Sequence, residues 1–408
     1  MNVGGLIAGV CLAALAALVL WRSSRAQARR IRWRGGEDQV HELRVLLGRM
    51  SRISVVCGAA AAFLCVGWVR WPGISPGAAA VVVVLAAACL ALPPAAARRP
   101  VVSTYARLRG IPVRALRSYR RLAAAAIMTA VMLWPLAVVL AVRMSLAVGF
   151  LILLVGCLVA NPVLTGLLAP ALAWLLGPAA LPAEVGARLS RLSAELGVRV
   201  HGRLAQARER KVANAMQVGW LPRLRYVLVS DYLLDMLTPA EVDACLAHEL
   251  AHARHHDYVV RALLRGLVLF VPCLLLAWAV AARPSGPLFL LAVLVTAGVV
   301  LFGLRPLSGA VLIREELAAD DVAVTVAGAA VLVAALNRLT ELNAIKRETS
   351  LAYDQDVGHP GMARRLARLG EVLTGEPPAT SQEAGMADRA GREHPVRRRI
   401  SGRRRPSD

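Results

Sequence analysis

The sequence predicts a mainly α-helical protein that crosses a membrane about seven times and carries a polar domain. Of its 408 residues, 57% are hydrophobic and only 18% are charged, whereas soluble proteins average about 45–50% and about 25%. The mean hydropathy is +0.57, and apolar runs long enough to cross a bilayer recur along the chain. These observations exclude a single water-soluble globule. Six of the seven cysteines lie in apolar runs, which excludes a disulfide-bonded secreted scaffold.

The apolar runs define the predicted membrane spans. We expect spans at residues 3–21, 53–69, 77–97, 122–142, 146–168, 266–282 and 287–304. The first run is expected to be a true span rather than a signal peptide, because no basic residue precedes it and Arg22 and Arg25 follow it. Asn161-Pro162 interrupts the fifth run, which is therefore either kinked or ends early and continues as a surface helix through Trp174.

The net charge of +22 is unevenly distributed between the predicted spans. Arginines concentrate in the loops after the first and third spans, and the other short connections are nearly free of them. Arginine-rich short loops stay in the cytoplasm. We therefore expect a multi-pass protein of the plasma membrane with its N-terminus outside and its C-terminus inside. Both polar regions, 178–265 and 305–408, then lie on the cytoplasmic side.

Three regions follow from this layout. Residues 1–177 form an N-terminal transmembrane region of about five spans, and residues 178–374 form a polar domain interrupted by a transmembrane hairpin at 266–304. Residues 375–408 are rich in Pro, Gly, Ser and Arg and are predicted to be a disordered basic tail. Its arginine clusters lack interleaved aromatic residues, so we expect membrane lipids as partners and no nucleic acid.

Residues 237–257 contain a helix with a pattern typical of zinc sites. Thr238, Pro239 and Glu241 have the types and spacing of an N-cap, a first helical residue and a capping-box glutamate. His248 and His252 lie four residues apart, so both imidazoles lie on one helical face and can bind one metal ion. The intervening Glu249 is placed to take a proton from a metal-bound water. The neighbouring histidines 255 and 256 are expected to be solvated or to support the ligands, and Cys245 to be a core residue rather than a thiolate ligand.

A third protein ligand is expected downstream of the predicted hairpin. On a helix, Glu316 and Asp320 share a face, so Glu316 can bind the metal while Asp320 hydrogen-bonds the free ring nitrogen of a ligand histidine. Glu315 points about 100° away from Glu316 and is the competing ligand. Asp320 has a simpler alternative role, which is to pair with a base such as Arg314.

These motifs resemble those of the M48 family of membrane metallopeptidases, which includes the HtpX-like enzymes and the CAAX prenyl endopeptidases. Four blocks occur in the family's order. They are the Asn-Ala-x-x-x-Gly strand from Asn214, the His-Glu-Leu-x-His helix, the Glu-x-x-Ala-Asp run from Glu316, and His359-Pro360 followed by Arg365 and Leu369. A seven-span layout resembles the CAAX endopeptidases more than the four-span HtpX enzymes. The Glu315-Glu316 pair and the extra Asp321 also resemble the M56 sensor-type metallopeptidases.

The resemblance implies a gluzincin-type endopeptidase with one Zn²⁺ per chain, held by His248, His252 and Glu316, with Glu249 as the general base. It also implies a small β-sheet before the zinc helix, whose strand at Asn214 aligns and binds the substrate. His359 is then expected to stabilise the tetrahedral oxyanion, and Arg365, near it, to bind the substrate. The predicted substrates are membrane or membrane-associated polypeptides. The alternatives are an M56-like signalling receptor that cleaves itself or a repressor, and a catalytically silent membrane scaffold. The sequence predicts neither the cleavage preference nor the oligomeric state.

Overall fold

The computed structural model describes residues 3–34, 38–67, 76–112, 146–282 and 304–374, together with the single residues 295 and 299. The predicted span at 122–142 and the basic tail at 375–408 lie outside the described residues, as does nearly all of the span at 287–304. The described part is mainly helical and contains one small sheet, as predicted.

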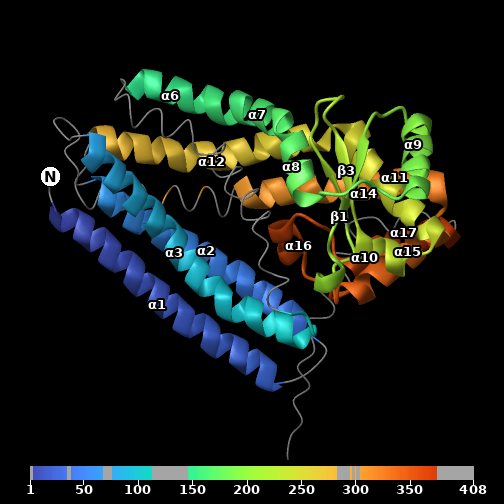
Figure 1. Ribbon diagram of the computed structural model, residues 1–408, viewed down its shortest axis with the longest axis horizontal. Coiled ribbons are helices and arrows are strands. Elements are labelled where there is room, and N and C mark those ends of the chain that lie inside the picture. Colours follow the sequence, from blue (N-terminus) through green and yellow to red (C-terminus); the bar gives the residue numbers. More distant parts are fainter. Residues whose placement is uncertain are drawn as a thin grey trace, which may run out of the picture.

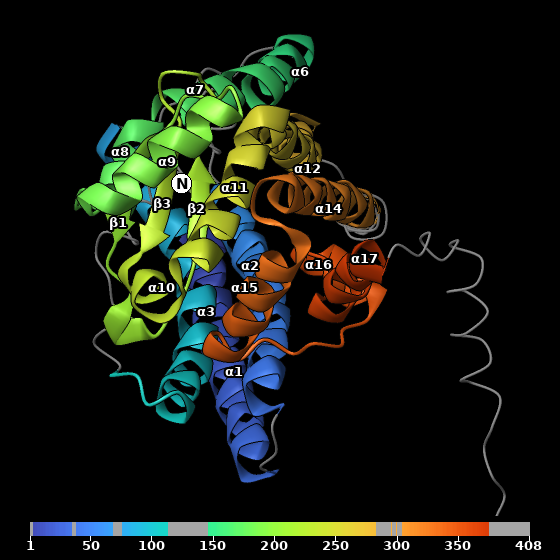
Figure 2. The ribbon, with the colours of Figure 1, turned by 90° about the vertical axis from the view of Figure 1, so that its right-hand side faces the viewer.

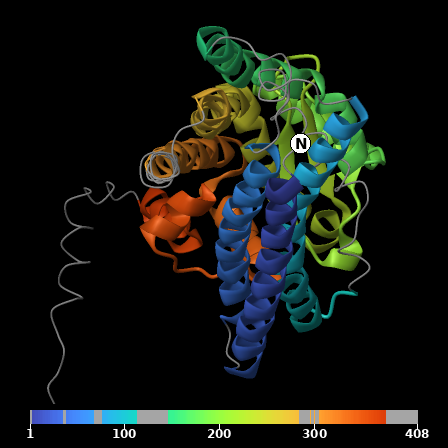
Figure 3. The same ribbon diagram turned by 90° about the vertical axis from the view of Figure 1, so that its left-hand side faces the viewer.

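Three long helices, α1 (Val3–Arg34), α2 (Gln39–Gly67) and α3 (Pro76–Leu108), form an N-terminal bundle. They lie side by side (Figure 3) around a core that includes Leu20, Leu43 and Val101. The outer face of α1 exposes large apolar side chains, and Leu15 is 59% exposed. Such a face is suited to lipid rather than to water. The helix also continues past the predicted end of the apolar run at residue 21, because the arginines that follow are good helix formers.

The fifth predicted span continues through Asn161-Pro162. α6 (Leu146–Val155) passes into a π-helical turn, η1 (Gly156–Ala160), and then into α7 (Asn161–Leu167). In this turn the Asn161 amide donates to the carbonyl of Gly156, so the wider turn accommodates the proline without ending the helix. The break falls at Leu168, after which the short helix α8 (Ala169–Leu176) leads to the sheet. Two alternatives were predicted for this run, an interrupted span and an early end followed by a helix through Trp174, and each is therefore confirmed in part.

The sixth predicted span is the later part of α12 (Asp257–Ala282), which begins earlier than the predicted residue 266. α12 packs against η1 and α7, and a side chain at Gly266 would collide with the carbonyl oxygen of Cys157. Three described helices are long and apolar enough to cross a membrane, with candidate spans at Leu6–Arg34, Ala147–Leu167 and Asp257–Leu275.

The sheet has three strands in the order β1-β3-β2, and all three precede the zinc-motif helix. β1 (His201–Ala205) pairs in parallel with β3 (Tyr226–Ser230), and β2 (Ala215–Val218) pairs antiparallel with β3. Within the described part of the chain, no strand pairs with the other edge of β2. That edge faces the helix that carries the histidines.

The polar domain packs around α11 (Pro239–His255), the helix of the zinc motif. α9 (Ala183–Glu195) and the sheet cover one side of it, and α14 (Arg305–Ala327) and α15 (Ala329–Leu342) cover the other (Figure 2). Leu246 and Leu250 are fully buried against Val227 and Val229 of β3. Replacing either leucine with alanine is expected to cost about 2–5 kcal/mol of stability. This core fixes the rotation of α11, and therefore the direction of its histidines.

Arginines at the ends of the N-terminal bundle hold it against the polar domain, which lies at the other end of the molecule from the N-terminus (Figure 1). Arg109 donates to the carbonyl oxygens of Leu342 (2.6 Å) and Lys211 (2.8 Å), and Arg44 donates to that of Ala344 (3.0 Å). The contacts with Leu342 and Ala344 satisfy carbonyls at the C-terminal end of α15, where cations are favourable. The arginine-rich ends of the bundle and the polar domain therefore lie on the same side.

Candidate metal centre

The N-terminus of α11 is capped as the sequence predicts. The Thr238 hydroxyl accepts from the amide of Glu241, and the Glu241 carboxylate accepts from the amide of Thr238 at 2.7 Å. Pro239 occupies the first turn, where no amide donor is needed. The capping box fixes where the helix starts, so His248 and His252 lie about three and about four turns later on the same face.

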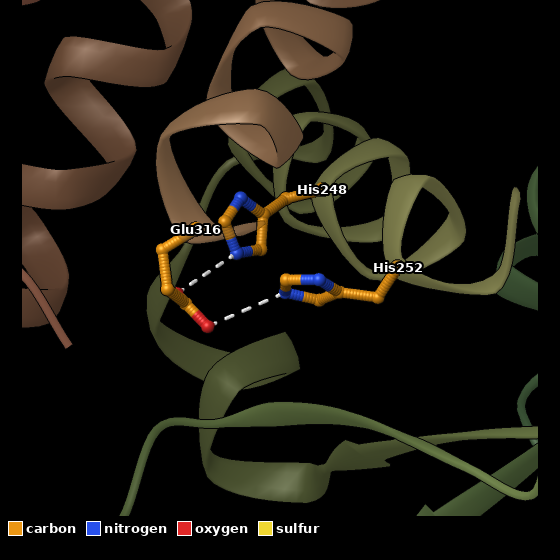
Figure 4. A group of neighbouring side chains, drawn as sticks. All are labelled: His248, His252 and Glu316. Carbon is orange, nitrogen blue, oxygen red and sulfur yellow. Dashed lines mark ion pairs between the residues drawn. The ribbon is translucent and has the colours of Figure 1, made fainter. Parts of the chain in front are cut away.

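His248, His252 and Glu316 converge from α11 and α14 (Figure 4). The Glu316 Oε2 atom lies 3.5 Å from His248 Nε2, and its Oε1 atom lies 3.5 Å from His252 Nε2. A tetrahedral ion with bonds of about 2.0–2.2 Å separates its ligand atoms by about 3.3–3.6 Å. The ligand atoms of the three residues all lie within 4.8 Å of one another, and two imidazoles with one carboxylate are a donor set typical of zinc. The group can therefore hold a metal ion.

Glu315, the competing ligand, points elsewhere. Its carboxylate accepts from Arg261 Nε at 2.8 Å, and the Nη2 atom of the same guanidinium donates to Glu316 Oε1 at 2.9 Å. Burial raises the pKa of Glu315, although Arg261 opposes this effect. Arg261 thus bridges the two neighbouring glutamates, and of the two only Glu316 lies beside the histidines.

Each ligand histidine has a carboxylate beside its other ring nitrogen. His248 Nδ1 lies 3.0 Å from Asp320 Oδ1, in the place that the sequence predicts for Asp320. His252 Nδ1 lies 2.8 Å from Asp257 Oδ2, at the start of α12. α11 ends at His255, and the left-handed backbone of the next residue, His256 (φ 60°), turns Asp257 back toward His252. Both carboxylates leave the Nε2 atoms free to face Glu316.

The metal-free cluster is a network of opposite charges. Burial lowers the pKa of His248, but its contacts with Asp320 and Glu316 outweigh burial and raise the pKa to about 9. Burial raises the pKa of Glu316, but His248 and His359 hold it well below its usual range. The pKa of Asp320 is likewise lowered by His248 and Arg365 despite burial. At neutral pH His248 is therefore protonated without a metal, and a metal ion replaces this proton.

Glu249 points toward the sheet. Its Oε2 atom accepts from the backbone amide of Gln217 at 2.7 Å. In the pairing of β2 with β3, the backbone amides and carbonyls of Met216 and Val218 point toward β3. Those of Ala215 and Gln217 therefore point to the free edge. Asn214 continues this strand. Its carbonyl accepts from the amide of Ser230 at 2.9 Å, and its side chain is exposed. Glu249 thus lies between the metal ligands and an open strand edge.

His359 and Arg365 occupy different places around the cluster. His359 Nδ1 lies 3.2 Å from Glu316 Oε2, and its side chain is 61% exposed. The Arg365 side chain is 11% exposed and donates to both oxygens of Asp320, at 2.7 and 2.5 Å. Asp320 therefore pairs with Arg365 rather than with Arg314. His359 is accessible to a ligand, whereas Arg365 contacts the site through Asp320.

The remaining residues considered in the sequence lie apart from the ligands. His255 and His256 are exposed, and Cys245 is 8% exposed in the core against the sheet. Sequence reasoning missed Asp257, Arg261 and Gln217. A charged pair at the start of an apolar run was the available signal for Asp257 and Arg261. Nothing in the sequence indicates which backbone amide meets Glu249.

The comparisons with known proteins agree with this geometry. The profile of Peptidase family M48 matches residues 180–373. Protease HtpX homolog 1 of Streptomyces coelicolor is 30% identical over 201 residues, which cover 42% of this chain and 66% of that protein. Protease HtpX of Psychrobacter sp. is 46% identical over 55 residues, 14% of this chain and 18% of that protein. The chain thus aligns with about a fifth of the length of several HtpX relatives.

The fold has a solved counterpart. The crystal structure of S. mikatae Ste24p superimposes with a TM-score of 0.60 and 13% sequence identity, over 88% of this chain and 98% of that one. At this identity the likeness concerns the fold. The family profile identifies residues 180–373 as a domain of peptidase family M48, and the similarity to the HtpX relatives supports this assignment.

Proposed function

We propose that this protein is an integral membrane zinc endopeptidase that hydrolyses peptide bonds of membrane or membrane-associated proteins. The observation that carries the proposal is the convergence of His248, His252 and Glu316 beside Glu249 and the free edge of β2. A single Zn²⁺ is the metal that this donor set and the family favour. The catalytic unit is residues 178–374, interrupted by the hairpin at 266–304.

Each residue of the site has one task in this reaction. His248, His252 and Glu316 hold the metal, which supplies Lewis acidity and lowers the pKa of water. Glu249 accepts a proton from the attacking water and passes it to the leaving amine. His359, exposed and next to Glu316, donates to the oxyanion of the tetrahedral intermediate. Asp320 and Arg365 hold His248 in position, so Arg365 acts on the ligands rather than on the substrate.

The free edge of β2 is the proposed substrate-binding element. An extended peptide that adds to this edge bonds with the outward backbone groups of Ala215 and Gln217. The amide of Gln217 is now bonded to Glu249. A peptide that takes over this amide releases the Glu249 carboxylate to act as a base. Asn214 directly precedes β2, and we expect it to contact the substrate where the bound peptide passes the metal.

The orientation of the protein follows from its arginines. We propose seven spans with the N-terminus outside the cell and the active site in the cytoplasm. The three candidate spans of the described residues and the likeness to Ste24p support an integral membrane protein. The contacts of Arg44 and Arg109 with the peptidase domain support placing that domain on the arginine-rich, cytoplasmic side.

Casein cleavage by the purified full chain in detergent tests the proposal. We expect Glu249→Gln to lower turnover by about 10²–10⁴-fold while bound zinc is retained. Glu348→Gln, on an exposed loop, is the matched control and keeps full activity. His252→Ala is expected to lose zinc, whereas His255→Ala on the same helix keeps it. Full activity in Glu249→Gln would sink the mechanism, and stoichiometric zinc without turnover in the wild type would favour a silent scaffold.

A further inference from the structure

A basic hollow of about 370 Å³ lies on the side of the peptidase domain where the sheet meets the end of α11. Three separate segments line it. The loop after α9 contributes Arg199, the β2–β3 loop contributes Arg225, and the end of α11 contributes Arg254 and His256. No carboxylate is among its lining residues. This volume lies within the range of about 300–1,000 Å³ that is typical of ligand pockets.

Arg225 forms the floor of this hollow and is only 5% exposed. Its Nε atom donates to the carbonyl of Trp220 at 2.9 Å, and burial lowers the pKa of its guanidinium. In the described parts of the chain, no Asp or Glu lies within ion-pair distance of Arg225 or of the Arg199, Arg254 and His256 side chains at the rim. A buried charge without a counter-charge is unfavourable. Arg365, the largely buried arginine of the metal centre, has the Asp320 carboxylate as its counter-charge.

The hollow lies where the candidate spans end. Trp220, whose carbonyl binds Arg225, also donates its indole Nε1–H to the carbonyl of Pro162 in α7, at 2.9 Å. The span at Ala147–Leu167 ends on this helix, and the span at Asp257–Leu275 begins one residue after His256. α7 and α12 run together into the peptidase domain at this level (Figure 1). The rim is therefore at the height of the lipid headgroups.

We propose that this pocket binds the phosphate of an anionic phospholipid headgroup, with Arg225 at its floor and Arg199, Arg254 and His256 at its mouth. Guanidinium groups match phosphate oxygens in charge and in two-pronged geometry. Basic pockets beside the cytoplasmic ends of membrane helices are suited to anionic lipids. The bound phosphate supplies a counter-charge to Arg225. It also fixes the β2–β3 loop, which Trp220 anchors to α7, at a defined depth in the membrane. The site is independent of metal binding and of the proposed peptidase activity.

Lipid binding by the purified full chain tests this proposal. The protein is reconstituted in nanodiscs of phosphatidylcholine alone or with one-fifth phosphatidylglycerol, and the retained lipids are counted by native mass spectrometry. We expect the wild type to retain phosphatidylglycerol in preference to phosphatidylcholine. Arg199→Gln combined with Arg254→Gln removes two exposed charges without disturbing the core. Each lost charge-assisted hydrogen bond is expected to weaken this preference at least about tenfold.

The control is Arg223→Gln, which removes an exposed arginine of the same β2–β3 loop that does not line the hollow. It is expected to keep the preference for phosphatidylglycerol. Arg225→Gln should abolish the preference, and because this substitution can also perturb folding, the exposed double variant decides. An equal loss in Arg223→Gln and in the double variant would overturn the proposal, because general surface charge then explains the binding. Thermal stabilisation by inorganic phosphate without any preference for phosphatidylglycerol would overturn the assignment to lipid.

Discussion

The two histidines of the candidate metal centre are supported in different ways. His252 is held by Asp257, five residues later in the chain, across the break between α11 and α12. His248 is held by Asp320 of α14, and Asp320 is in turn held by Arg365 of α17 (Met362–Thr374). One support is a local carboxylate–histidine pair. The other is a chain of three charged groups from three helices.

This difference separates local from tertiary control of the site. The geometry of His252 follows from the αL residue that ends α11, so it forms whenever the two helices form. The geometry of His248 requires that α14 and α17 pack against α11. We therefore infer that the metal centre is complete only in the fully assembled domain, and that damage to the His248 side affects folding as well as metal binding.

The largest effect is expected from Asp320→Asn. It leaves the largely buried Arg365 cation without its carboxylate, which is expected to cost about 3–5 kcal/mol of unfolding free energy. It also releases His248, so zinc affinity should fall about 10–100-fold. Thermal unfolding of the metal-free protein and competitive zinc titration measure the two effects separately.

Two further variants sharpen this result. Asp321→Asn removes the neighbouring carboxylate, which is 53% exposed and pairs with Arg368 at 2.8 Å, and it should change stability by at most about 1 kcal/mol. Adding Arg365→Gln to Asp320→Asn removes the unpaired cation, so stability should recover in part while zinc affinity stays low. Similar losses in Asp320→Asn and Asp321→Asn would contradict the proposed role of the Asp320–Arg365 pair.

Asp257→Asn is expected to have a smaller effect. The amide oxygen of asparagine can still accept from His252 Nδ1–H, so zinc affinity should fall toward the lower end of the range of about 10–100-fold. In the described residues His252 is the only base within ion-pair distance of Asp257. No buried cation is therefore abandoned, and the stability loss should stay near about 1 kcal/mol. A loss as large as that of Asp320→Asn would mean that both sides depend equally on tertiary packing.

The same division between local and tertiary contacts explains which features of the site could be predicted from the sequence. Local patterns predicted the capping box of Thr238 and Glu241 and the shared face of His248 and His252, whereas the sheet before α11 was implied by the resemblance to the M48 family. The choice between Glu315 and Glu316 and the partner of Asp320 depend on side chains from distant segments, namely Arg261 and Arg365. No helical spacing encodes these contacts. The start of α12 was not predicted, because the charged residues Asp257 and Arg261 make its first turns look too polar for a membrane helix. In the structure Asp257 pairs with His252, and Arg261 pairs with Glu315 and Glu316.

Asp354 supports a third part of the site, the loop that carries His359. Its buried carboxylate accepts from Thr349 Oγ1 (2.5 Å) and from the amide of Gly361 (2.7 Å), and Arg364 lies 3.0 Å away. Asp354→Asn should displace His359 without touching the metal ligands, so we expect kcat to fall about tenfold with unchanged zinc affinity. Steady-state kinetics beside a zinc titration check this split. Loss of zinc would show that the loop also supports Glu316.

The smallest effect concerns Cys245, one turn before His248. Burial, followed by the charge of Glu249, raises the pKa of its thiol to about 12. The neutral thiol is thus favoured in the folded protein. The stability that it contributes is fully present below the ordinary thiol pKa of about 8.5, and it is lost as the pH rises from there toward about 12. Iodoacetamide labelling followed by peptide mass spectrometry should leave Cys245 unmodified at pH 8.5 in the folded chain and label it in denaturant. Labelling in the folded protein that is blocked by zinc would instead make Cys245 a metal ligand, and the His248 side would then contain a fourth protein donor.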